Sequence, residues 1–135
     1  MGETPPSRPR RILTAEFYQT EIGNEPVRDW LKTLSQADRQ QIGKDVRKTE
    51  YGWPLGMPTC DSLGAGLWEV RTNLHDRIAR VFFCMEGARM VLLHGIIKKS
   101  RTAPKADLDT ARDRKRNLEA RLRDLAKRKT PRTET

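Results

Sequence analysis

The chain has 135 residues, 33% of them charged, and its mean hydropathy is −0.79. This length and polarity favour one water-soluble domain with a modest core. The longest apolar runs, Val81–Phe83 and Val91–Leu93, are far shorter than the roughly 20 residues that a membrane-spanning helix needs. We therefore expect no membrane segment, and no secretory signal because no apolar stretch follows the N-terminal arginines.

A strong excess of positive charge limits the kinds of partner. The 27 Lys and Arg residues outnumber the 18 Asp and Glu residues, which gives a formal net charge of +9. Such a balance favours a polyanion, either nucleic acid or an anionic membrane surface. Cys60 and Cys84 have neither the number nor the spacing of a disulfide framework or a zinc site. We therefore expect reduced thiols in a cytoplasmic protein, with no metal and no cofactor.

The two ends of the chain differ in composition from its middle. Residues 1–10 contain three prolines and no periodic apolar face, which predicts a flexible basic arm. Residues 127–135 include four basic residues and no large apolar one, which predicts a loose basic tail. We expect a single domain over residues 11–126, with a first strand within Arg11–Tyr18.

Two helices are expected after this strand. Asn24 is suited to cap the first helix, with Pro26 in its first turn. Ser35 and Asp38 have the spacing that begins the second helix, and Gly52–Pro54 ends it. The short connection predicts that the two helices form an antiparallel hairpin. The first helix carries an apolar stripe at helical spacing, formed by Val27, Trp30, Leu31 and Leu34.

The second half of the chain alternates like a sheet. Leu55–Gly66 contains three glycines and predicts a loop. Three strands are expected over Leu67–Thr72, Arg77–Cys84 and Met90–Lys98, and their hairpin-sized connections predict antiparallel pairing. Pro104 then opens a last helix.

This order of elements predicts an α+β fold, in which the helical hairpin packs on one face of a small, mostly antiparallel sheet and a C-terminal helix follows. We expect the other face of the sheet to be uncovered and to carry the functional side chains.

Basic residues stand where these strands meet. Arg71 ends one strand, Arg77 and Arg80 lie at the start of the next, and Lys98 and Lys99 end the third, closely followed by Arg101. In an antiparallel meander these ends share one edge, so distant cations converge there. Like charges that gather in one place repel each other unless an anion binds among them. The cluster therefore predicts phosphate binding.

A cluster of Arg and Lys suits cleavage of RNA. Arg binds phosphate oxygens bidentately and stabilises charge that develops during the reaction. A Lys crowded by other cations is suited to proton transfer. RNA supplies its own nucleophile, the 2′-hydroxyl, so the protein needs only to position and stabilise charge. His75 lies at the tip of a predicted hairpin, where its side chain is able to reach RNA.

Three segments of the chain resemble, in order, a known family pattern. Gly66–Arg71, Arg77–Phe83 and Leu92–Pro104 are similar to the pattern GLWELR…RIxRVxF…LLHGFxKKTxKTP of the phage-derived HigB-like branch of the RelE/ParE superfamily. The resemblance extends over about Arg11–Ala111. The chain departs from the pattern at a few positions, which keep the charge of the motif: Ile96 replaces Phe, Ser100 replaces Thr, Arg101 stands near a usual Gln or Lys, and Ala103 replaces Thr.

The resemblance implies a RelE-like fold and a function. It implies the toxin of a type II toxin–antitoxin module, a ribosome-dependent mRNA endoribonuclease that inhibits translation. It also implies three kinds of partner: a HigA-like helix-turn-helix antitoxin, the ribosome with its mRNA, and operator DNA bound only through the antitoxin.

The resemblance also implies which residues act. Those that match the basic positions of the motif, and are therefore implied to be catalytic, are Arg71, Arg80, Lys98 and Lys99. Which of them is the general base and which the acid stays open. The expected RNA contacts are Arg77, Arg101, Lys105 and His75.

Two other functions remain compatible with this sequence. One is a ParE-like inhibitor of gyrase on the same fold, although such an inhibitor does not need convergent cations. The other is a non-enzymatic nucleic-acid-binding protein, which explains the charge but not its clustering.

Overall fold

The structure, a computed structural model, describes residues 10–129. Residues 1–9 of the expected arm and residues 130–135 of the expected tail lie outside this range. None of the helices in the described range combines the length and apolar composition that a membrane crossing requires. The elements follow in the order β1 (Thr14–Phe17), α1 (Pro26–Lys32), α2 (Gln36–Gly52), β2 (Cys60–Gly64), β3 (Leu67–Leu74), β4 (Arg77–Glu86), β5 (Arg89–Lys98) and α3 (Lys105–Lys129).

The strands form one mixed sheet in the order β1-β5-β4-β3-β2. Strand β1 runs parallel to β5, and the other neighbours are antiparallel. The α+β class is therefore confirmed. The loop expected over Leu55–Gly66 is wrong in part, because β2 pairs with β3. Strand β2 is a short edge strand that ends in glycine, so it lacks the apolar alternation that marked the other strands.

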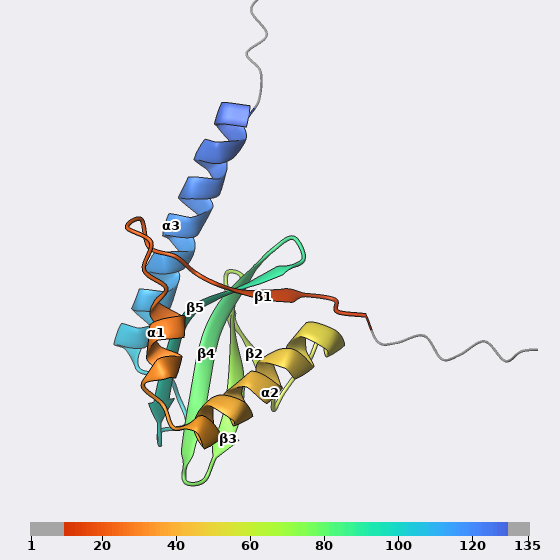
Figure 1. Ribbon diagram of the computed structural model, residues 1–135, viewed down its shortest axis with the longest axis vertical. Coiled ribbons are helices and arrows are strands. Elements are labelled where there is room, and N and C mark those ends of the chain that lie inside the picture. The colour runs from red at the N-terminus through yellow and green to blue at the C-terminus, as the bar shows by residue number, and fades with distance from the viewer. Residues whose placement is uncertain (1–9, 130–135) are drawn as a thin grey trace, which may run out of the picture.

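Helices α1 and α2 lie on one face of the sheet, as Figure 1 shows. Helix α1 contacts β5 and β1, whereas α2 contacts β3 and β1. The start of α2 is confirmed, because the backbone N–H of Asp38 donates to Ser35 Oγ at 3.2 Å. The cap of α1 is Glu25 and not Asn24, and its side chain makes no capping hydrogen bond. Close packing of the two helices on each other stays a prediction, since their main contacts run to strands.

The opposite face of the sheet is covered by α3, which contradicts the expectation of an open face. The reason lies in β4, whose side chains are apolar on both sides: Val81 and Phe83 face α1 and α2, while Phe82 and Cys84 face α3. A strand with two apolar faces must be buried on both. Helix α3 also runs to Lys129, so the helix does not end at the domain boundary expected after residue 126.

Gly95 in β5 is required by a close approach of α1. A Cβ built at Gly95 would lie 2.3 Å from two ring atoms of Trp30, far inside van der Waals contact. We expect Gly95→Ala to lower the free energy of unfolding by about 1–3 kcal/mol, because the indole must shift. Gly43→Ala is the matched control, since its Cβ would meet no atom within 4 Å.

Urea unfolding of both variants checks this prediction. Gly43 lies within α2, so its replacement by Ala should leave stability unchanged or raise it by about 0.5–1 kcal/mol. If both glycine variants were equally stable, the packing of the Trp30 indole would not require a glycine at position 95.

Candidate functional site

The register of the sheet brings three of the four candidate catalytic residues onto one side. Arg71 of β3 lies directly opposite Arg80 of β4, and Lys98 of β5 lies opposite Ile78. Residues two apart in a strand point the same way, so Ile78 and Arg80 share a face. Arg71, Arg80 and Lys98 therefore lie on the α3 side of the sheet, near the end where β3 and β5 finish and β4 begins.

The expectation that Arg80 faces solvent is wrong, because its side chain is 0% exposed. Its Nε lies 3.5 Å from Glu69 Oε2, and its Nη2 donates to the carbonyl oxygen of Arg101. Burial lowers the pKa of Arg80 from its ordinary value, and the Glu69 carboxylate opposes this shift. Arg80 thus ties β4 to β3 and to the loop after β5.

Glu69 is the residue that sequence reasoning missed. It is buried, and its Oε1 accepts a hydrogen bond of 2.8 Å from Arg71 Nε. One carboxylate therefore holds two guanidinium groups, from Arg71 and Arg80. The signal was present in the sequence, since alternation along β3 places Glu69 on the same side as Arg71.

The exposed cations form a rim that we call the cationic edge: Arg71, Lys98, Lys99 and Arg101. Arg71 is 25% exposed and lies 4.0 Å from Asp61 Oδ2. Lys98 ends β5 and Lys99 begins the following loop, and both are exposed. Among the residues that the structure describes, neither lysine has an ion-pair partner. The cationic edge therefore carries positive charge that no residue in the range 10–129 neutralises.

The other expected RNA contacts are Arg77, His75 and Lys105. Arg77 faces α2, where its Nη2 lies 3.2 Å from Asp38 Oδ2. His75 is exposed at the turn between β3 and β4. Lys105 begins α3 and forms an exposed ion pair of 3.0 Å with Asp109. None of these three therefore adds an unpaired cation beside Lys98.

His94 is held on both sides by hydrogen bonds. Its Nε2 lies 2.7 Å from Asp107 Oδ1, and Arg114 Nη1 lies 3.2 Å from its Nδ1. Because a guanidinium can only donate, Nδ1 accepts and the proton of the neutral ring lies on Nε2. His94 therefore fastens β5 to the first turns of α3, as expected for a structural histidine.

Cys60 and Cys84 are both free thiols and both buried. Burial raises the pKa of Cys84 to about 11, so this thiol stays protonated and is a poor nucleophile. Within residues 10–129, no group of three His, Cys, Asp or Glu side chains is placed to hold a metal ion.

Comparison with known proteins places the chain in a family. Residues 29–116 match the family described as phage-derived protein Gp49-like (DUF891), which is well over half of the chain. The chain belongs to the Gp49-like family. This family lies among the RelE/HigB-like toxins of toxin–antitoxin systems. No curated protein matches the chain.

The Gp49-like region contains all the residues of the cationic edge and the Arg80–Glu69 pair. It begins within α1 and ends within α3, so it includes β2 to β5. The family-level resemblance predicted from three motifs is therefore confirmed. Residues 117–129, the second half of α3, lie outside the matched region.

Proposed function

We propose that this Gp49-like protein is the HigB-type toxin of a type II toxin–antitoxin module and inhibits translation by cutting mRNA on the ribosome. The observation that carries the proposal is the cationic edge, where Lys98 and Lys99 are exposed and form no ion pair within residues 10–129. Two adjacent unpaired lysines repel each other in the free protein. A phosphodiester supplies the negative charge that removes this repulsion.

A second unpaired group of cations supports a large polyanionic partner. Helix α2 carries four exposed basic side chains that form no ion pair within residues 10–129: Arg39, Lys44, Arg47 and Lys48. Other arginines in the described range are neutralised, as Arg77 is by Asp38 and Arg89 by Glu16. Unpaired charge on more than one surface fits a partner as extensive as ribosomal RNA.

The proposed reaction uses the 2′-hydroxyl of RNA as the nucleophile. Its oxygen forms a bond to phosphorus while the bond to the 5′ oxygen breaks, which leaves a cyclic phosphate and a 5′-hydroxyl. One proton leaves the 2′ oxygen and one reaches the 5′ oxygen, and in this proposal Lys98 and Lys99 exchange them. Arg71 would bind the non-bridging oxygens, whose charge grows in the transition state.

Arg80 takes a different part in this proposal from the one expected. Buried beneath the loop after β5, it would position Arg71 through their shared partner Glu69, and hold the loop through the carbonyl of Arg101. It is a positioning residue and not a group that touches RNA.

An antitoxin partner follows from membership of a toxin–antitoxin family. We propose that this antitoxin is a HigA-like helix-turn-helix protein, that operator DNA is bound only through it, and that the toxin acts in the cytoplasm.

Expression without an antitoxin is expected to stop growth by halting translation. Pulse labelling with an amino acid and with thymidine checks this, and amino-acid incorporation should fall first. Thymidine incorporation that fell first would instead favour a gyrase inhibitor on the same fold. If neither fell, the non-enzymatic binding protein would gain support.

A further inference from the structure

The core-facing stripe of α3 continues past the sheet. Ala111 and Leu118 pack against the sheet, and Leu122 and Leu125 follow on the same side of the helix. In Figure 1 the second half of α3 extends beyond the strands. Ala111 is fully buried, whereas Leu125 is 49% exposed. The apolar stripe is thus longer than the surface that buries it. We call residues 117–129 the overhang.

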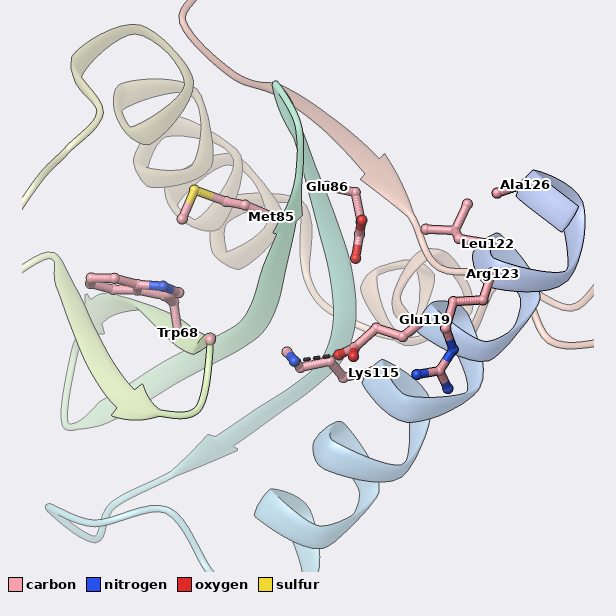
Figure 2. A pocket seen from close by; sticks show the side chains of 9 residues that line it. Trp68, Met85, Glu86, Lys115, Glu119, Leu122, Arg123 and Ala126 are labelled. Atoms are coloured by element: carbon pink, nitrogen blue, oxygen red, sulfur yellow. Dashed lines mark hydrogen bonds and ion pairs between the residues drawn. The ribbon is translucent and has the colours of Figure 1, made fainter. Parts of the chain in front are cut away.

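A cavity lies on each side of the overhang. One, of about 490 Å³, is lined on the α3 side by Lys115, Glu119 and Leu122. Figure 2 shows that the side chains of Trp68 and Met85, which also border it, point away from α3 towards the other face of the sheet. The other, of about 590 Å³, lies towards β1 and is lined by Phe17, Leu122 and Leu125. Leu122 therefore lies between two hollows, of which the one towards β1 has an apolar wall that includes Val91 and Leu118.

Polar contacts hold the overhang in place. Tyr18 Oη donates to Asn117 Oδ1 at 2.7 Å, and Asn117 Nδ2 donates to Glu21 Oε1 at 3.2 Å. Arg121 donates to the carbonyl of Gln19 and its guanidinium lies 5.2 Å from the centre of the Tyr18 ring. The overhang is consequently a preorganised surface, which lowers the entropy lost on binding.

The end of the overhang is positively charged. Arg123, Lys127 and Arg128 are exposed there, against one acidic side chain, Asp124. Within the described range none of the three cations forms an ion pair. The surface thus combines half-exposed leucines with unneutralised positive charge, which suits a partner that is both apolar and acidic.

We propose that the overhang and its two cavities bind an acidic amphipathic helix of the antitoxin, whose apolar side chains cover Leu122 and Leu125. This inference rests on the proposed function, because it takes the antitoxin as the partner. RNA is a poorer occupant, since phosphates neutralise cations but leave leucines in water. A second copy of the chain is disfavoured too, because it would bring two positive overhangs together.

The position of this surface has a consequence for neutralisation. Trp68 lies near the start of β3 and Met85 near the end of β4, whereas Arg71 lies in the middle of β3 and Lys98 is the last residue of β5. A helix bound at the overhang therefore leaves the cationic edge uncovered. A substitution in the overhang should then weaken antitoxin binding without reducing toxicity.

Calorimetric titration of the full chain tests the proposal. The probe is the purified product of the reading frame adjacent to its gene, the place where the antitoxin of such a module is encoded. Leu125→Glu should weaken binding about 100-fold, because it buries a charge in an apolar contact. Lys127→Glu, which cannot disturb the core, should weaken it about 10-fold at low salt and less at high salt. Both variants should still arrest translation when no antitoxin is present.

Two matched controls isolate the surface. Ile12 is 49% exposed, as Leu125 is, and its backbone N–H donates to the carbonyl of Glu50 in α2, which packs on the opposite face of the sheet from α3. Lys32 is exposed at the end of α1. Ile12→Glu and Lys32→Glu should change affinity by no more than about twofold.

Four results would overturn the inference. Unchanged affinity of both overhang variants would show that the antitoxin binds elsewhere. Loss of translation arrest with antitoxin binding intact would assign the overhang to the ribosome. A dimer of the unaltered chain that Leu125→Glu dissociates would assign it to a second copy. If the unaltered chain arrests translation but does not bind the adjacent product, this inference fails while the proposed function stands.

Discussion

Arg80→Ala is expected to lower the free energy of unfolding by about 3–5 kcal/mol, the usual cost of removing one partner from a buried ion pair. The guanidinium is fully buried, and the side chain of Glu69 is only 2% exposed. Without Arg80, Glu69 keeps the contact of Arg71 to Oε1 but its Oε2 loses the cation beside it. Urea or thermal unfolding measures this loss.

A paired substitution separates the buried charge from the packing. Arg80→Met combined with Glu69→Leu removes both charges and keeps apolar volume, so much of the lost stability should return. An Arg80→Ala chain within about 1 kcal/mol of the unaltered protein would contradict this account of the pair. Any loss of toxicity in Arg80→Ala would therefore reflect the lower stability of the fold as well as slower cleavage.

The double variant Lys98→Ala, Lys99→Ala is expected to lose toxicity with its fold intact. Both side chains are exposed and neither has an ion-pair partner within residues 10–129, so their removal breaks no internal contact. Removing one preorganised charged group at a developing charge typically costs about 10²–10³ in rate. The double variant should reach at least this loss in mRNA cleavage, while its unfolding midpoint stays unchanged.

Lys127→Ala is the matched control for that variant. Lys127 is also an exposed lysine with no ion-pair partner in the described range, but it lies on the overhang. It should remain fully toxic. If Lys127→Ala lost toxicity as the double variant does, the cause would be the reduced net charge and not the cationic edge.

The strands that carry the cationic edge could be predicted from the sequence because their pattern is local. Alternation and short connections gave the meander of β3, β4 and β5. Antiparallel pairing of β3 and β4 then predicted that Arg71 lies near Arg80, and the two residues are direct partners in the register. The capping spacing of Ser35 and Asp38 located the start of α2 for the same reason.

What failed depends on contacts between segments far apart in the chain. Arg80 follows the strand alternation correctly, but its burial depends on a loop that crosses it from residue 101. The cover of α3 over the second face was signalled by Phe82 and Cys84, which make β4 apolar on both sides. Strand β2 gave no such signal, because a short edge strand needs only its neighbour to form.

The measurement that tests the central claim most directly is mapping of mRNA ends in a purified translation system. The unaltered protein should cut mRNA on translating ribosomes and leave fragments with 5′-hydroxyl ends, and it should cut the same RNA poorly without ribosomes. The Lys98→Ala, Lys99→Ala chain should leave the message intact. Uncut mRNA on ribosomes, together with inhibition of gyrase in a supercoiling assay, would contradict the proposed endonuclease.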